Sequence, residues 1–220
     1  NRSGLEFLKA VVVGYEVSTR LGAAVQPSHY SFFHTTGTAG AIGSAAAAAF
    51  LIDPENPNLF AHAVATATTF ASGLQQAFRS DAMTKALHGG HAASIGVTAA
   101  KSAAKGITGA LDILEGDVGF AAALSKGGNW EVAIAGLGQN YNICKMTQKN
   151  HGCCGHTFAA IDSAIMIRET MLKKGLALAD VQNIEVRTYQ TALDVTGNFS
   201  PESALQCRVS LPYVLAHGFL

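Results

Sequence analysis

The sequence predicts a mainly helical protein, in which an all-helical domain rich in Ala and Gly precedes the start of a smaller α+β domain. The first 125 residues or so carry Ala-rich apolar runs separated by Gly and Pro breaks. Beyond residue 130 the pattern changes, and a helix is followed by an alternating, strand-like segment. We expect a helical domain at residues 1–135 and an α+β domain at residues 136–220, each of them partial.

The helices of the first domain are predicted from caps and breaks. Ser3 and Glu6 have the spacing of a capping box, and Asp53–Pro57 is a helix stop. Helices this rich in small residues have thin side-chain layers, so their axes can pack closely. The expected helices cover about residues 3–21, 41–52, 59–74 and a fourth stretch that carries Lys85 and continues to about residue 105.

The second domain begins with mixed, glycine-spaced sequence. Apolar residues at helical spacing predict a helix from His156 to Lys174, ended by Gly175. The alternation over residues 184–189 predicts a half-buried strand.

Composition excludes several classes of partner. Lys plus Arg and Asp plus Glu both number 15 in 220 residues, so the strong basic field of a nucleic-acid binder is absent. The longest apolar run, about residues 37–52, is too short and too rich in Ala and Gly to span a membrane. Only 14% of residues are charged, which predicts a partly covered surface, either in an oligomer or under further segments of a longer chain. Four cysteines without a regular framework favour a reducing, cytoplasmic location, or the mitochondrial matrix in a eukaryote.

Lys85 and His88 are three residues apart in the predicted fourth helix, so both side chains share one face. Small neighbours leave that face open, and a cation beside an imidazole suits a carboxylate ligand. The alternative is an ordinary solvated face. A metal pair of His88 with His91 lacks a third ligand on the helix.

A second polar segment, His34–Gly40, precedes the Ala-rich helix. Its imidazole and backbone N–H groups suit an anion at the helix start. The alternative is a helix cap by Thr36 or Thr38, with His34 exposed.

Two further segments lie in the second domain. Lys149, with the helix start at His156, suits an anion, although zinc binding and tight packing by small residues are alternatives for the Cys153–Cys154 cluster. Arg208 suits bidentate contact with a carboxylate, and Tyr213 suits proton transfer. The alternative for this last segment is a structural edge with a core tyrosine.

Taken together, these segments resemble the MmgE/PrpD family. The resemblance rests on five motifs: Gly14–Val17 with Arg20–Gly22, His34–Gly40, Met83–Ala93, Lys149 with Cys153–Thr157, and Ser210–Tyr213. Met83–Ala93 is the most specific of them. The sequence departs from the family pattern at Thr35, where Pro is usual, and at Asn150–Gly152.

The resemblance implies a helical domain joined to a smaller α+β domain, an active site in the cleft between them, and a homodimer without metal or organic cofactor. It implies catalytic roles for His34, Lys85 and Tyr213, and substrate contacts for Lys149, with His88 and His156 as adjacent candidates. Arg208 joins the substrate-binding set as a carboxylate ligand. Family members also carry an earlier Asp and His segment, so we expect this chain to be the middle of a longer protein that lacks part of the catalytic set.

The family's reactions remove a proton or a carboxylate next to a carboxylate group. The leading expectation is a metal-independent lyase acting on a small di- or tricarboxylate, by elimination of water as in 2-methylcitrate dehydratase. Decarboxylation of cis-aconitate and epimerisation of iminodisuccinate are alternatives within the family. A non-catalytic, truncated binding or structural homologue is the alternative of another class.

Overall fold

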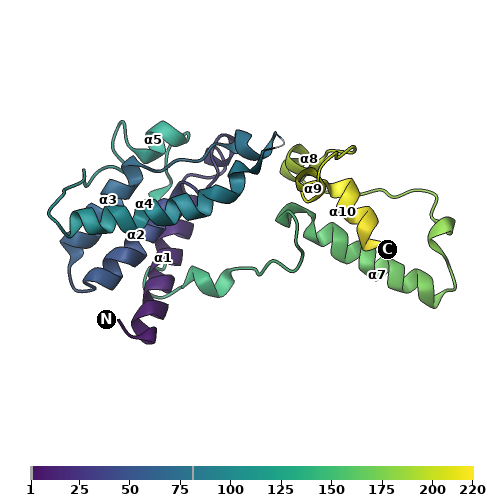
Figure 1. The fold of residues 1–220 in the computed structure, drawn as a ribbon, viewed down its shortest axis with the longest axis horizontal. Coiled ribbons are helices and arrows are strands. Elements are labelled where there is room, and N and C mark those ends of the chain that lie inside the picture. Colours follow the sequence, from purple (N-terminus) through teal and green to yellow (C-terminus); the bar gives the residue numbers. More distant parts are fainter. Residues whose placement is uncertain (1, 81) are drawn as a thin grey trace. The chain divides into compact units, whose positions relative to one another are not determined.

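The computed structural model describes residues 2–80 and 82–220, apart from the side chain of Phe78, and divides into two compact units, residues 1–146 and 147–220 (Figure 1). Nothing in this division tests the predicted domain boundary at residues 135 and 136, which stays a prediction. No helix among the described residues is long and apolar enough to cross a membrane.

Unit 1 is built on four long helices: α1 (Gly4–Ala24), α2 (Ala39–Ile52), α3 (Pro57–Thr69) and α4 (Leu87–Ala103). Shorter elements follow or join them: the 3₁₀ turns η1 (His29–Ser31), η2 (Gln75–Phe78), η3 (Met83–Ala86) and η4 (Asn142–Lys145), with the helices α5 (Phe120–Leu124) and α6 (Trp130–Ile134). The mainly helical fold class is therefore confirmed.

The predicted capping box starts α1. The Glu6 amide donates to the Ser3 hydroxyl, and the Ser3 amide donates to the Glu6 carboxylate at 2.7 Å. The bond from the Ser3 amide, followed by the Ser3 hydroxyl and Arg2, lowers the pKa of Glu6 to about 2. The helix therefore begins where the sequence predicts.

The core of unit 1 is made largely of alanine. α2 packs against α1, α3 and α4 (Figure 1), and its buried face meets α3 and α4 through small side chains. Gly96 on α4 faces α2 so closely that an added Cβ would lie 2.5 Å from the backbone carbon of Ser44. The predicted close packing is thus made between main chains. The buried cluster comprises Ala41, Ala45, Ala49, Leu59, Ala63, Ala67, Ala92, Ile95, Ala99 and Ala100.

A buried ion pair fastens the end of unit 1 to α1. Arg20 Nε donates to Glu16 at 2.7 Å, and the Arg20 guanidinium also donates to the carbonyls of Ala133, Ala135 and Asn140. The Glu16 carboxylate accepts the Asn142 amide. Both charges are hydrogen-bonded, as buried charges must be.

Unit 2 contains η5 (Gly155–Thr157), α7 (Phe158–Lys173), η6 (Leu178–Asp180), α8 (Gln190–Thr196), α9 (Ala204–Cys207) and α10 (Leu211–Gly218). Its small core forms where Leu215 and Phe219 pack on Ala164 of α7. The helix predicted from His156 to Lys174 is found, with its first turn in 3₁₀ form.

Three details of the prediction are wrong. The strand expected at residues 184–189 is not formed, because a strand needs a neighbour for its ladder, and the described residues contain only an isolated bridge between Phe33 and Leu74. The third helix ends at Thr69 rather than near residue 74. Lys85 lies in η3 instead of in the fourth helix, which starts at Leu87.

Candidate functional site

A backbone pairing positions His34 in unit 1. The His34 amide donates to the Gly73 carbonyl at 2.8 Å, and the Gln75 amide donates to the Phe32 carbonyl at 2.9 Å. Gly73 has a φ of +132°, and a Cβ on Gly37 would lie 2.3 Å from the Ser72 carbonyl oxygen. Two glycines therefore let the His34 segment and the Gly73 segment meet without intervening side chains.

This contact brings His34 against His88 of α4. Their Nδ1 atoms are 2.8 Å apart, and their ring centroids are 5.1 Å apart. One Nδ1 must donate while the other accepts, so the two neutral rings carry opposite tautomers. One Nε2 is then a proton acceptor and the other a donor. Both functions of an acid–base pair are present in adjacent rings.

Burial and nearby positive charge lower the pKa of His88. Burial is the largest cause that lowers the pKa of His88, followed by the charges of His91 and Lys85. Lys85 is half-buried in η3, which contacts α4, so it acts on His88 from the preceding turn. A neutral imidazole near neutral pH can accept a proton, and the lysine can attract an anion.

His29 is a buried histidine that the sequence reasoning did not select. Its Nδ1 donates to the Leu124 carbonyl at 3.0 Å, its Nε2 lies 2.8 Å from the Thr38 hydroxyl, and its ring stacks on Phe33. Thr38 precedes α2 but makes no capping hydrogen bond with its side chain. The alternative interpretation is thus met in position, since Thr38 is the N-cap residue of α2, but its hydroxyl bonds to His29 in place of a capping amide. His29 is a structural residue.

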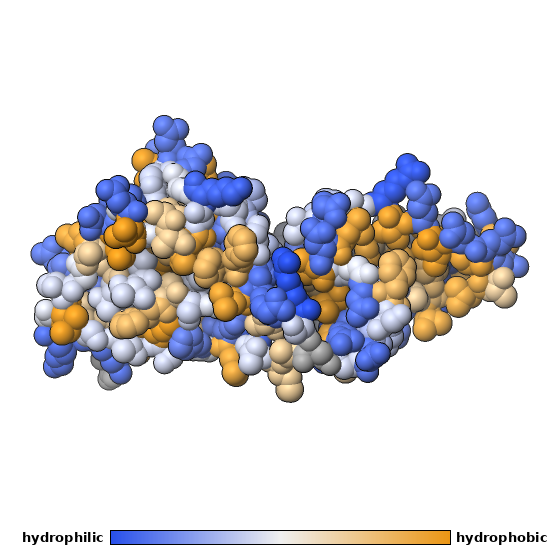
Figure 2. Space-filling view, turned by 90° about the horizontal axis from the view of Figure 1, so that it is seen from above, coloured by the Kyte–Doolittle hydropathy of each residue, from blue (hydrophilic) through white to orange (hydrophobic). Residues whose placement is uncertain are grey.

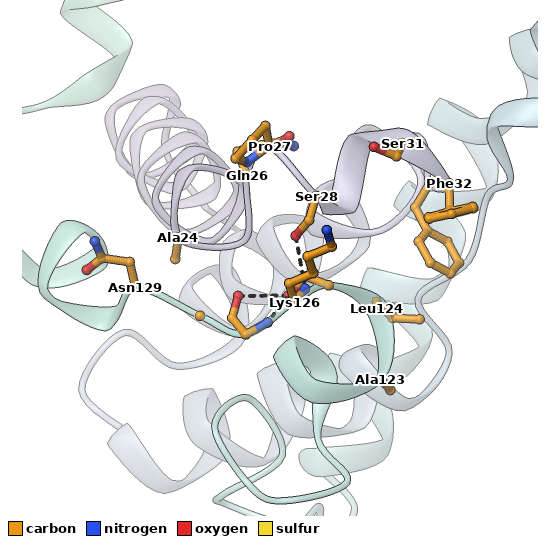
Figure 3. Close-up of a pocket in the computed structure, with 14 residues that line it drawn as sticks. Ala24, Gln26, Pro27, Ser28, Ser31, Phe32, Ala123, Leu124, Lys126 and Asn129 are labelled. Carbon is orange, nitrogen blue, oxygen red and sulfur yellow. Dashed lines mark hydrogen bonds between the residues drawn. The ribbon is translucent and has the colours of Figure 1, made fainter.

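A large open pocket of about 1010 Å³ lies between the segments 24–33 and 123–129 (Figure 3). Lys126 is the charged residue of its lining, and the Lys126 amide donates to the Ser28 hydroxyl at 2.9 Å. No imidazole, carboxylate or thiol lines it, and none of the predicted site residues does. Size alone does not supply acid–base chemistry, so His34 and His88 are the candidate acid–base groups of unit 1.

In unit 2 the segment that contains Cys153 and Cys154 lies next to the segment that contains Arg208 and Tyr213. The Cys154 amide donates to the Arg208 carbonyl at 2.9 Å. Ser210 caps α10 by accepting the Tyr213 amide, and its hydroxyl donates to the Asn198 carbonyl. Tyr213 is thereby held in the first turn of α10 with its side chain half exposed.

His156 meets an aromatic residue that the sequence reasoning missed. Its Nδ1 is hydrogen-bonded to the hydroxyl of Tyr189, and the two rings meet edge to face with centroids 5.6 Å apart. Tyr189 lies in the segment predicted as a strand, and no local sequence pattern relates it to His156, which is 33 positions away. Lys149 and Arg208 are exposed, Lys149 in a segment without helix or strand.

The cysteine cluster does not resemble a metal centre. All four cysteines are free, and the Cys153 thiol lies 3.4 Å from the Thr157 hydroxyl. Within residues 2–80 and 82–220, no three His, Cys, Asp or Glu side chains are grouped as metal ligands. The zinc alternative therefore finds no ligand set among these residues.

These features define a helical protein of two units, one with a histidine pair beside a lysine and the other with a histidine–tyrosine pair. The MmgE/PrpD N-terminal domain matches residues 1–133, and the MmgE/PrpD C-terminal domain matches residues 151–220. The chain belongs to the MmgE/PrpD family.

Two curated relatives extend this comparison. A cis-aconitate decarboxylase from Aspergillus terreus is 26% identical over 229 residues, which cover 97% of this chain and 46% of the relative. A second Aspergillus terreus cis-aconitate decarboxylase sequence matches with the same identity and coverage. The chain thus spans about half the length of the curated relatives it matches.

Proposed function

We propose that the protein is a lyase that acts on a small di- or tricarboxylate by removing a proton next to a carboxylate group. The observation that carries the proposal is the hydrogen bond between His34 and His88, formed beside the Lys85 cation. Membership of the MmgE/PrpD family supports it. The matched relatives support the lyase class.

The chemistry follows from the two rings. The Nε2 that carries a lone pair removes the proton, and the electron pair left on carbon forms the new double bond as hydroxide leaves with a proton, giving water. Negative charge develops on the adjacent carboxylate during this step. Lys85 stabilises that charge as a fixed cation.

The residues of unit 2 have proposed roles in the same reaction. Lys149, His156 and Arg208 bind substrate carboxylates, and Tyr213 supplies a proton. These roles derive from the family motifs and are tested by substitution.

Elimination of water from 2-methylcitrate is the reaction we place first, in keeping with the histidine pair as a proton acceptor. Decarboxylation of cis-aconitate is the second candidate, and the two Aspergillus terreus decarboxylases favour it. In that reaction one carboxylate leaves as CO₂, the electron pair of the broken C–C bond stays on the carbon that carried it, and a proton must be delivered there. The Nε2–H of the other ring is the proposed donor.

The test is proton NMR of the complete gene product in D₂O with 2-methylcitrate or cis-aconitate, with and without excess chelator. Consumption of 2-methylcitrate with new alkene signals supports the dehydratase, and itaconate formed from cis-aconitate supports the decarboxylase. A His34→Asn variant is the matched control and should lose either activity. No turnover and no deuterium exchange on either acid would contradict the proposal and favour a binding protein.

A further inference from the structure

The histidine–tyrosine pair of unit 2 joins two elements that are distant in the sequence. His156 lies in η5, immediately before α7, and Tyr189 is the residue from which α8 starts. A hydrogen bond joins His156 Nδ1 to the Tyr189 hydroxyl. Both side chains line one pocket of about 320 Å³, which also takes in Arg187 and Leu215.

The chemistry of the two groups sets the direction of this bond. A phenol O–H is a good donor, whereas the unprotonated nitrogen of imidazole is a better acceptor than a phenolic oxygen. Tyr189 therefore donates to Nδ1, and the ring proton of neutral His156 resides on Nε2. The partner of one ring nitrogen decides the state of the other.

Each element that carries a member of the pair also contains a buried threonine. Thr157, next to His156, is fully buried, and its hydroxyl donates to the Cys154 carbonyl at 2.7 Å. Thr196, at the end of α8, is also fully buried, and its hydroxyl donates to the Ala192 carbonyl at 2.6 Å. Thr157 thus fixes the backbone next to His156, and Thr196 anchors the end of α8 opposite to Tyr189. The bond between the two side chains then restricts the imidazole ring itself.

We propose that Tyr189 is a positioning residue, which holds His156 as an Nε2–H donor for a carboxylate oxygen of the substrate. The inference rests on the proposed function, because it assumes a carboxylate substrate. Tyr189 does not touch the reacting atoms in this scheme. It acts through His156 alone.

A spectroscopic measurement tests the hydrogen bond without turnover. Two-bond ¹H–¹⁵N correlation spectra, with His156 assigned through His156→Gln, should show protonated Nε2 and a hydrogen-bonded Nδ1 in the natural protein. Tyr189→Phe keeps the ring and removes the hydroxyl, so the Nδ1 resonance should move towards that of a free imidazole nitrogen. An unchanged His156 spectrum would overturn the inference, even in a protein that turns over neither acid.

Kinetics test the link to the substrate. Losing one hydrogen bond of this kind should raise KM for the carboxylate about three- to tenfold in Tyr189→Phe, with a smaller change in kcat. In a His156→Gln background the same substitution should have no further effect, because the two residues act as a unit. Additive effects would refute the positioning role. Tyr141→Phe, an exposed tyrosine of unit 1, is the matched control.

Discussion

Three histidines of unit 1 show how surroundings decide the role of one residue type. His29 is enclosed and has both ring nitrogens bonded to Leu124 and Thr38, so it serves the fold. His34 and His88 bond to each other through their Nδ1 atoms and stay half-buried, so solvent and solutes can reach the pair. Full burial distinguishes the structural histidine from the paired ones.

Lys85→Met should lower kcat about 10²- to 10³-fold, because removal of one well-placed charge partner costs a few kcal/mol of transition-state stabilisation. Lys101→Met, an exposed lysine on α4, is the matched control and should keep full activity. Steady-state kinetics give kcat for each variant, and the urea midpoint shows whether each variant is as stable as the natural protein. Natural turnover in Lys85→Met would remove this residue from the mechanism.

The protein should lose stability in mild acid, in part through His29. Burial lowers the pKa of His29, with the Leu124 hydrogen bond opposing the shift, so the unfolded chain binds a proton more readily than the folded one. The free energy of unfolding therefore falls as the pH drops below about 6.5, by at most about 1.4 kcal/mol per pH unit for one proton. His88, whose pKa is also lowered, contributes with the same sign.

Urea unfolding at about pH 7.5 and about pH 5.5 measures this dependence. His29→Gln should reduce the slope with pH, whatever it does to stability at the higher pH. His217→Gln, at an exposed histidine of unit 2, is the matched control. Equal slopes in the natural protein and in His29→Gln would show that another group is responsible.

At the scale of elements, the spacing between helices α2 and α4 is set by main chain. Gly96 is buried against Ser44 and Ala45, and the surrounding core consists mostly of alanines. Such a contact tolerates no added atom, since neither backbone can rotate out of the way.

Gly96→Ala should therefore destabilise unit 1 by about 1–3 kcal/mol, the usual cost of overpacking. Gly90→Ala on the same helix meets no atom within 4 Å and should instead stabilise the helix by about 0.5–1 kcal/mol. Denaturant midpoints of the two variants decide the matter. Equal effects would mean that α4 can shift away from α2.

The sequence predicts the helices well, because caps and breaks are local. Ser3, the stop at residues 53–57 and Gly175 mark ends within a few residues of those observed. Local signals of this kind do not decide whether residues 184–189 form a strand, because a strand needs a partner strand elsewhere in the chain. For the same reason the sequence does not indicate the hydrogen bond between His34 and His88, because that bond depends on the contact of the His34 segment with Gly73. The role of Tyr189 also depends on a residue distant in the sequence, so it could not be predicted.

At the scale of the molecule, the two units are joined by an exposed segment. Residues 146–154 contain neither helix nor strand, and Lys145 and Lys149 are exposed. Limited trypsin digestion should cut first after these lysines and leave two stable fragments. A Lys145→Gln/Lys149→Gln double variant should delay that cut. A first cut inside α4, for example after Lys101, would contradict the division into compact units.

Apolar side chains are also prominent on the surface. Figure 2 shows them among polar residues on both units, and Met166, Ile167 and Leu172 of α7 are largely exposed. This agrees with the low content of charged residues, which predicts a covered surface. The homodimer stays a prediction. Light scattering of the complete gene product should give twice the monomer mass, and a monomer at micromolar concentration would contradict it.

The close approach at Gly37 and Gly73 has a consequence for how this site can change. Main chain meets main chain there, and a Cβ on Gly73 would lie 3.3 Å from His88 Nδ1, so the two glycines leave room for the approach of His34 to His88. Substitution of either glycine would place a side chain in this contact, whereas substitution of other residues around the pair would leave the contact between the two segments in place. A mutational library aimed at new substrates should therefore keep both glycines and vary the neighbours. Such a library would explore specificity on an unchanged acid–base apparatus.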